Sequence, residues 1–157
     1  MKLTSIAFSN NESIPSKYTC DGDRLLSPPL SISDVPIEAK SLVLIMDDHD
    51  VPKVLRPDGV FDHWIVFDIP PDTKEIPEGG SVGGIVGING RGENAYTGPC
   101  PPPQYEPSEH CYFFKLYALD VELSLNENST KSDVLNEMTG HVVVEAELIG
   151  RYKKKIP

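Results

Sequence analysis

The sequence predicts an all-β protein, an antiparallel β-sandwich that carries one or two short helices. Two observations support this fold class. The apolar segments are short and are separated by turns rich in Pro and Gly, and only one segment has a convincing helical pattern. The 157 residues suit a single domain, 1–157, built around one core.

The predicted strands differ in how deeply we expect them to be buried. The first runs from Leu3 to Phe8. The segment "SLVLIMD" (41–47) is apolar throughout, which is typical of a central strand covered on both faces. The segments "HWIVFDIP" (63–70) and "CYFFKLYALD" (111–120) follow, and "HVVVEAELIGRY" (141–152) alternates as a half-exposed strand does.

One helix is predicted within "TKSDVLNEMTG" (130–140). Thr130 can cap its N-terminus, and Asp133 stands where a capping box places its acid. Gly140 can close the C-terminal end. This helix is short, so the β-rich fold class is unchanged.

Two long loops interrupt the strands. The first, 78–98, holds seven glycines between Gly79 and Gly92. A phosphate cradle needs such a turn to open a helix, and no helical pattern follows, so we predict a turn-rich surface loop without nucleotide binding. The second, "GPCPPPQYEPSEH" (98–110), is stiffened by its prolines and can hold a backbone rigidly beside a site.

The charge balance excludes some partners. Twenty-four acidic residues against fourteen basic ones give a net charge of −10, and no basic face of the kind that binds nucleic acid is present in the sequence. An acidic membrane surface would repel most of the protein. The basic tail "RYKKKIP" (151–157) is interpreted as a solvated, frayed terminus.

The three cysteines indicate a reducing compartment. Cys20, Cys100 and Cys111 are odd in number and lack metal-type spacing, so we expect three buried thiols. The sequence shows no membrane-spanning run and no leader pattern at its start. These features together predict a cytoplasmic protein.

Polar residues stand at the end of the buried segment 41–47. Asp48 and Asp50 are two residues apart, so in a continuing strand they point to one face and His49 points to the other. A plainer interpretation is also open, in which the aspartates only begin the turn before Pro52.

Two histidines stand at the start of other strands. His63 is two and four residues before Ile65 and Phe67, so in a regular strand it points to the same face and leans toward the core with them. His110 has the parity of Tyr112 and of the buried residues beyond it. Polar groups at three strand ends, in line with core faces, are expected to line a pocket at the rim, although each histidine alone could be a structural residue.

Three kinds of chemistry suit carboxylates beside imidazoles. They can bind a metal ion, act in general acid and base catalysis, or bind an anion, because a carboxylate bonded to an imidazole favours its cationic form. No activated nucleophile is evident, since Ser81 and Ser108 lie in no elbow motif and lack an obvious base.

Six stretches then carry a resemblance along nearly the whole chain: "CDGDRLLSPPLSISDVP", "LVLIMDDHDVP", "FDHWIVFDIPPDTKEIPEG", "YTGPCPPP", "HCYFFKLYALD" and "GHVVVEAELIGRY". In this order they are similar to the phosphatidylethanolamine-binding protein family, also called the Raf kinase inhibitor protein family, and most of all to its short bacterial and archaeal branch. The resemblance implies a β-sandwich of two antiparallel sheets with a small pocket for phosphate-like anions and phosphoryl head groups.

The resemblance also implies a set of binding residues. The family's Asp-Pro-Asp-Ala-Pro motif falls on 48–52, its pocket histidine on His63, its Gly-Pro segment on 98–99 and its Gly-x-His-Arg-Tyr motif on 108–112. The expected ligand-binding residues are Asp48, Asp50, His63, Gly98, Pro99, His110 and Tyr112. Two residues depart from the family pattern: His49 replaces a proline and Cys111 replaces an arginine.

The function expected from these residues is binding without catalysis. The expected partner is a phosphate-bearing small molecule or a phospholipid head group, with no metal or other cofactor. Regulation of a protein kinase or another partner, and a homodimer, are implied by the resemblance. Two alternatives stay open: a metal-dependent hydrolase that uses Asp48, Asp50, His63 and His110, and a structural dimerising domain whose polar cluster is only a hydrogen-bonded rim.

Overall fold

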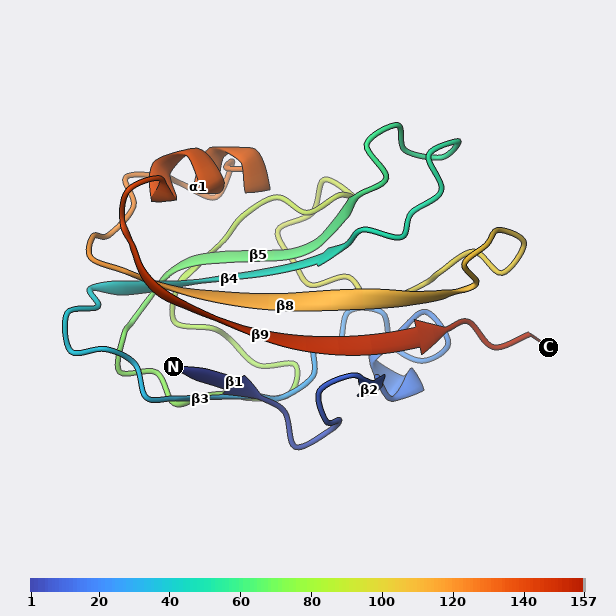
Figure 1. Cartoon of the computed structure of the whole chain (residues 1–157), viewed down its shortest axis with the longest axis horizontal. Helices are drawn as coiled ribbons and strands as arrows, with labels where there is room; N and C mark the ends of the chain where they lie inside the picture. The colour runs from blue at the N-terminus through green and yellow to red at the C-terminus, as the bar shows by residue number, and fades with distance from the viewer. Residues whose placement is uncertain (157) are drawn as a thin grey trace.

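A computed structural model describes residues 1–156 and shows a mostly β protein with two sheets and one α-helix (Figure 1). The smaller sheet has the strand order β1 (Lys2–Thr4), β3 (Leu30–Ser33) and β6 (Glu75–Ile76). The larger sheet has the order β2 (Glu12–Ser13), β9 (Val142–Lys153), β8 (Glu109–Leu119), β4 (Ser41–Asp48), β5 (Phe61–Ile69) and β7 (Ile85–Val86). A short 3-10 helix, η1, spans Ser16–Tyr18.

The predicted β-rich class with a short helix is confirmed. The sheets are of unequal size, and one pairing differs from the expected antiparallel pattern, because β2 runs parallel to β9. The first strand is also shorter than predicted. It ends at Thr4, since the Ser5 hydroxyl donates to the Pro29 carbonyl at 2.6 Å and accepts from the Ala7 amide at 3.1 Å, which turns the chain.

Strand β4 is buried on both faces, as its continuous apolar run predicts. Leu44 and Met46 pack in a core that the larger sheet shares with the smaller one. Val43 and Ile45 point to the opposite face and pack with residues of α1 (Lys131–Met138). In Figure 1, α1 lies on the other side of the larger sheet from β1 and β3. Strand β4 is therefore held firmly up to its polar end.

The predicted helix forms with its predicted cap. The Thr130 side chain accepts from the Asp133 amide, and the Asp133 carboxylate accepts from the Thr130 amide at 2.9 Å, which completes a capping box. Gly140 follows the helix with φ of +83°, a left-handed conformation that favours glycine. Val134 and Met138 are buried against the larger sheet.

A register shift in β5 decides where His63 points. Met46 of β4 pairs with Trp64, but the next residue, Asp47, pairs with Asp62, so His63 is the extra residue of a β-bulge. The prediction that His63 shares a face with Ile65 and Phe67 was wrong. Those two residues pack toward α1, and the bulge turns His63 to the opposite face.

Two cysteines are not the free thiols that the sequence predicts. Cys20 and Cys100 form a disulfide, whereas Cys111 is free. The two bonded residues are 80 positions apart, which is why sequence spacing alone did not pair them. The cysteines therefore give no support for a reducing compartment, and the cytoplasmic location stays a prediction. Within residues 1–156, no helix is long and apolar enough to cross a membrane.

The basic tail is held by hydrogen bonds as far as Lys155, whereas the sequence predicts a frayed terminus. The Asp21 carboxylate accepts from the Tyr152 hydroxyl at 2.5 Å, from Lys154 Nζ at 3.1 Å and from the Lys155 amide at 2.9 Å. The hydrogen bond from Tyr152, followed by that from the Lys155 amide, lowers the pKa of Asp21 to about 2. Asp21 follows Cys20, so the tail is tied to the segment that carries the disulfide.

Candidate functional site

A cavity of about 220 Å³ lies where three central strands of the larger sheet end. Its walls include Asp48 at the end of β4, His63 near the start of β5, and His110 and Tyr112 near the start of β8. Segments 97–98 and 100–102 complete it with Cys20 and other loop residues. The structure therefore brings polar residues from three strand ends together, as the sequence predicts.

His110 and Asp48 form the buried base of this site. Nδ1 of His110 lies 2.6 Å from Oδ2 of Asp48, and the imidazole is only 1% exposed. Burial alone lowers the pKa of His110, but the hydrogen bond and charge of Asp48 outweigh burial and raise it overall. The imidazole therefore holds a positive charge to higher pH than an ordinary histidine.

Two polar atoms at this base have no hydrogen-bond partner. Among residues 1–156, the side-chain atoms His110 Nε2 and Tyr112 Oη are buried without one. The Pro107 carbonyl also favours the charged form of His110, and Asp48 lies near the Tyr112 hydroxyl, but neither completes a hydrogen bond to these atoms. Burial, followed by the charge of Asp48, raises the pKa of Tyr112, so its hydroxyl keeps its proton. Both residues line the cavity, so these two atoms are the candidate donors to a ligand there.

His63 has a different hydrogen-bonding role. Its Nδ1 lies 2.7 Å from the Thr97 carbonyl oxygen, which only accepts, so Nδ1 carries the proton. Burial lowers the pKa of His63 and outweighs the effects of Thr97 and Asp48, which raise it. The ring is therefore neutral at pH 7, and its Nε2 is an acceptor. His63 therefore suits a ligand group that carries a proton, such as the hydroxyl of a phosphate monoanion.

Asp50 and Pro99 stand behind the cavity rather than in its wall. Oδ2 of Asp50 accepts from the Cys111 amide at 2.9 Å, and the Pro99 carbonyl accepts from the Cys20 amide at 3.1 Å. The chain turns after Asp48, whose Oδ1 accepts from the Asp50 amide at 2.8 Å, so the strand does not continue and the two aspartates do not share a face. The side chain that closes this turn is that of Asp48, which also lines the cavity, so Asp48 has both of the roles that the sequence left open.

Gly98 lines the cavity, but its small size serves the protein's own packing. A Cβ atom at this position would overlap the carbonyl oxygen of Tyr18. The Gly98 amide donates to the Arg24 carbonyl at 2.7 Å. Only glycine allows the two backbone segments to come this close.

The two departures from the family pattern also lie outside the cavity wall. His49 is nearly half exposed and pairs with Asp47 at 3.0 Å, away from the pocket. Cys111 points to the opposite side of β8 from His110 and Tyr112, and burial raises the pKa of its thiol. Neither residue presents a group to a ligand in the cavity.

Sequence reasoning missed several residues of the wall. Arg24, Phe61 and Arg91 line the cavity, and so does the Cys20–Cys100 disulfide. Arg24 and Arg91 lie in loops, where no periodicity indicates direction. Phe61 shares the parity of His63 and could have been included with it. The loop 78–98 is more than a surface loop, because it forms β7 and supplies Arg91, Thr97 and Gly98.

The arrangement suits binding of a small anion better than metal chemistry. Two buried donors and one acceptor face a cavity in which Asp48 is already bonded to protein groups. Within residues 1–156, no three His, Cys, Asp or Glu side chains are grouped so that they could share a metal ion, so the metal-dependent alternative gains no support.

Fold and cavity together define a β-rich domain with a small cavity at the strand ends, lined by both polar and apolar residues. The model of the phosphatidylethanolamine-binding protein family matches residues 4–153, nearly the full chain. The chain belongs to the phosphatidylethanolamine-binding protein family, as the resemblance implies.

Similar proteins agree with this assignment. A UPF0098 protein of Chlamydia trachomatis is 49% identical over 154 residues, which cover 98% of this chain and 99% of the relative. A solved structure of a phosphatidylethanolamine-binding protein homolog from Chlamydia trachomatis matches with a TM-score of 0.92 at 49% identity, covering 98% and 97% of the two chains. Escherichia coli YbcL, described as a member of the mammalian family, matches with a TM-score of 0.86 at 26% identity over 98% of each chain.

Proposed function

We propose that this protein is a binding module without catalytic activity, and that its pocket takes a phosphate group, either of a small molecule or of a phospholipid head group. The observation that carries the proposal is the pair of buried, unpartnered donors, His110 Nε2 and Tyr112 Oη. A buried polar group without a partner costs free energy, which an anion in the cavity would recover.

The His110–Asp48 pair can present a charged donor to an anion. Asp48 raises the pKa of His110, so the ring keeps its Nε2 proton to higher pH than an ordinary histidine does. Hydrogen bonds from charged donors to phosphate oxygens are shorter and stronger than neutral ones. The neutral His63 can accept the proton of a phosphate monoanion, so the three groups match the oxygens and the hydroxyl of one phosphoryl group.

A regulatory role follows from the family resemblance and belongs to this proposal as a prediction. Occupancy of the pocket would control a protein kinase or another partner, and the protein would act as a homodimer in the cytoplasm. The pocket's position beside loops rather than within a strand gives a bound ligand direct access to a partner surface.

The test is a titration with inorganic phosphate and with phosphorylethanolamine, followed by NMR of the imidazole signals. We expect His110 and His63 to shift with a dissociation constant near or below about 1 mM. Replacing His110→Gln should weaken binding about tenfold or more, because it removes the charged donor. The absence of any shift in the wild type at about 10 mM ligand would contradict the proposal.

A matched control comes from a second His–Asp pair. His141 Nδ1 lies 2.8 Å from Asp120 Oδ1, but both side chains are about half exposed and lie outside the cavity. His141→Gln removes a similar pair, so it should leave phosphate affinity unchanged. Equal losses in the two variants would indicate a non-specific effect of charge.

A further inference from the structure

The cavity wall carries two arginines that the proposed function does not use. Arg24 and Arg91 both line the cavity, and both approach the same carboxylate. Oε1 of Glu93 lies 3.1 Å from Arg24 Nη1 and 3.5 Å from Arg91 Nε. One carboxylate cannot neutralise two guanidinium groups, so positive charge remains on this wall in a chain whose net charge is −10.

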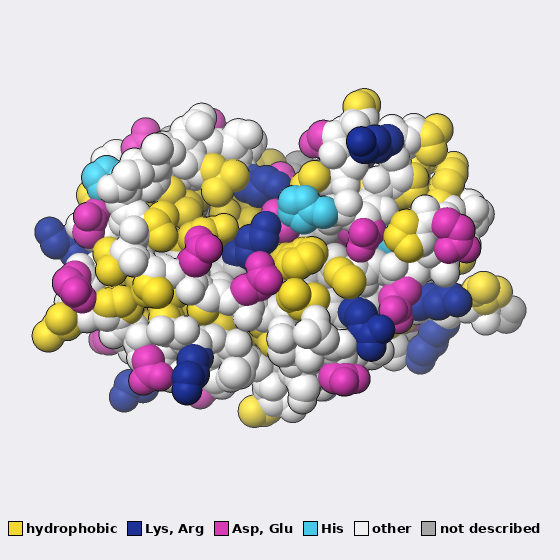
Figure 2. All heavy atoms as spheres, viewed as in Figure 1, with side chains coloured by type: hydrophobic (Ala, Val, Ile, Leu, Met, Phe, Trp, Pro, Cys, Tyr) yellow, Lys and Arg dark blue, Asp and Glu magenta, His cyan; other side chains and the backbone are white. Residues whose placement is uncertain are grey.

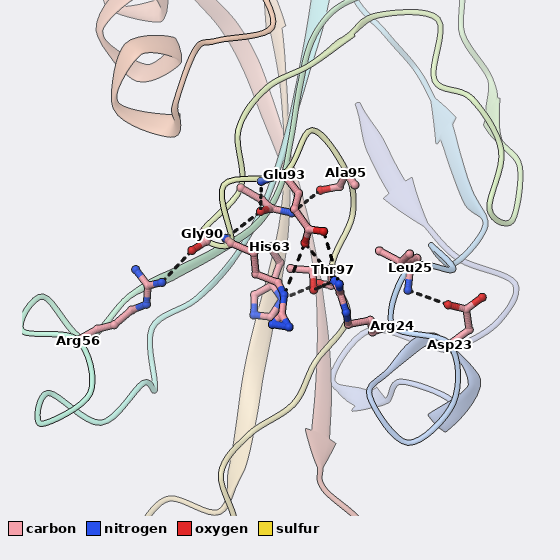
Figure 3. A network of polar contacts seen from close by, with 11 residues as sticks. Asp23, Arg24, Leu25, Arg56, His63, Gly90, Glu93, Ala95 and Thr97 are labelled. Carbon is pink, nitrogen blue, oxygen red and sulfur yellow. Dashed lines mark hydrogen bonds and ion pairs between the residues drawn. The ribbon is translucent and has the colours of Figure 1, made fainter.

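The turn that holds Arg91 is fixed by its own hydrogen bonds. Oδ1 of the buried Asn89 accepts from the Arg91 amide at 2.8 Å and from the Glu93 amide at 3.1 Å. Arg56 Nη2 donates to the Gly90 carbonyl at 2.9 Å, which ties the turn to a neighbouring loop (Figure 3). The backbone of Arg91 is therefore held at the cavity.

Arg24 is joined to the same wall as His63. Its Nη1 donates to Thr97 Oγ1 at 3.2 Å, and the Thr97 carbonyl accepts from His63 Nδ1 at 2.7 Å (Figure 3). A single residue of the loop thus orients both a guanidinium group and an imidazole. The cationic wall and the phosphate-binding groups belong to one hydrogen-bonded unit.

Among the residues that line the cavity, the carboxylate that could meet a ligand's ammonium group is Asp48, and it is already bonded to protein groups. Both oxygens of Asp48 already accept, Oδ2 from His110 at 2.6 Å and Oδ1 from the Asp50 amide at 2.8 Å. Asp50 lies outside the wall. Asp48 thus orients the His110 ring, and an ammonium group would have to compete with these hydrogen bonds.

We propose that Arg91 and Arg24 form a second subsite, which binds an anion. The preferred ligand is then a phosphate ester that carries a further anionic group such as a carboxylate. This proposal rests on the proposed function, in which the phosphoryl group accepts hydrogen bonds from His110 and Tyr112. The planar fork of an arginine matches a carboxylate, and the ligand would take the place that Glu93 now shares between the two guanidinium groups.

Two probe molecules isolate the second group. O-Phosphoserine is phosphorylethanolamine with one added carboxylate, so their difference in affinity reports that carboxylate alone. We expect O-phosphoserine to bind about tenfold tighter by isothermal titration calorimetry. In Arg91→Gln the affinity for O-phosphoserine should fall about tenfold more than the affinity for phosphorylethanolamine, so the preference is lost.

Two further variants sharpen the test. Glu93→Gln releases both arginines without touching the backbone bonds of the turn, so the preference for O-phosphoserine should grow. Arg151→Gln is the matched control, because Arg151 Nη1 pairs with Glu109 Oε1 at 3.1 Å and is partly exposed, outside the cavity wall. It removes the same charge and should leave the preference unchanged.

The outcomes separate this proposal from the one before it. Failure of inorganic phosphate to bind overturns both proposals. Binding of phosphate with equal affinities for the two probes, or equal losses in the Arg91 and Arg151 variants, overturns only the second subsite.

A last comparison identifies the source of the ligand. Sedimentation with phosphatidylcholine vesicles that contain phosphatidylserine, abolished in Arg91→Gln, assigns the subsite to a lipid head group. Binding of O-phosphoserine without sedimentation assigns it to a free phosphate ester. Either result supports the two-anion chemistry, because both require Arg91.

Discussion

His110 and Asp48 form a buried ion pair that joins β8 to β4, with Nδ1 2.6 Å from Oδ2 and side chains that are 1% and 4% exposed. The pair lies at the base of the cavity, so the same contact serves the fold and the site. Because Asp48 also accepts from the Asp50 amide, the carboxylate is fixed in position. Its charge can then act steadily on the imidazole.

The first prediction concerns the pH dependence of stability in Asp48→Asn. The folded protein raises the pKa of His110 above 6.5, so it holds this proton more tightly than the unfolded chain does. The stabilisation is complete below pH 6.5 and is lost as pH rises through the folded pKa. Urea unfolding from about pH 5.5 to about pH 9 should show the wild type more stable than Asp48→Asn by about 2 kcal/mol at the acidic end, and by less at the basic end. A difference in stability that is constant with pH would contradict the assignment of this stabilisation to the protonation of His110.

The second prediction separates function from stability at Tyr112. Its hydroxyl is buried without a hydrogen bond, so Tyr112→Phe removes an unsatisfied polar group and keeps the ring. We expect the free energy of unfolding to rise by about 1 kcal/mol, and phosphate affinity to fall about tenfold. Thermal unfolding and NMR titration measure the two effects. A loss of stability would mean that the hydroxyl has a structural partner and is not held for a ligand.

The central part of the fold could be predicted from the sequence. The continuous apolar run of 41–47 identified a strand covered on two faces, and the Thr130–Asp133 spacing identified the helix with its cap. The parity of His110 with Tyr112 also holds, because β8 runs without interruption from Glu109 to Leu119. These features are local or strictly periodic, so they need no knowledge of distant contacts.

The remaining features depend on contacts between distant segments. His63 reaches the cavity only through a bulge, which shifts its register by one residue and reverses its face. The Cys20–Cys100 bond and the pairing of Arg24 with Glu93 join segments 80 and 69 positions apart. The tail carries charges that suggest solvation, yet Asp21 binds it. No local pattern contains this information.

The third prediction concerns the disulfide. It closes a segment with a sequence separation of 80, and both sulfur-bearing residues line the cavity. Cys20→Ser combined with Cys100→Ser should lower the free energy of unfolding by about 2–4 kcal/mol, because the unfolded chain regains freedom. Phosphate affinity should fall as well, since the wall beside Gly98 loses its covalent anchor. Urea unfolding and phosphate titration check this, with Cys111→Ser as the control that leaves both unchanged.

The last prediction concerns a second buried carboxylate, adjacent to Asp48 in sequence but on the opposite face of β4. Asp47 is 2% exposed and lies 3.4 Å from Lys115 Nζ and 3.3 Å from Lys131 Nζ, with His49 at 3.0 Å. Burial lowers the pKa of Lys131, but the hydrogen bond and charge of Asp62, with help from Asp47, raise it overall, so the lysine is charged. Basic, acidic and histidine side chains gather near the centre of the face in Figure 2.

Asp47→Asn should therefore lower the free energy of unfolding by about 3 kcal/mol, because two partly buried lysines lose a shared partner. Adding Lys131→Met should cost less than the sum of the single changes, since the two residues interact directly. The control Asp120→Asn breaks an exposed pair and should change stability by less than about 1 kcal/mol. Phosphate affinity should be unchanged in Asp47→Asn, because alternate residues of a strand face opposite sides and only Asp48 lines the cavity. A clear loss of phosphate affinity in Asp47→Asn would show that the two faces of β4 are not independent.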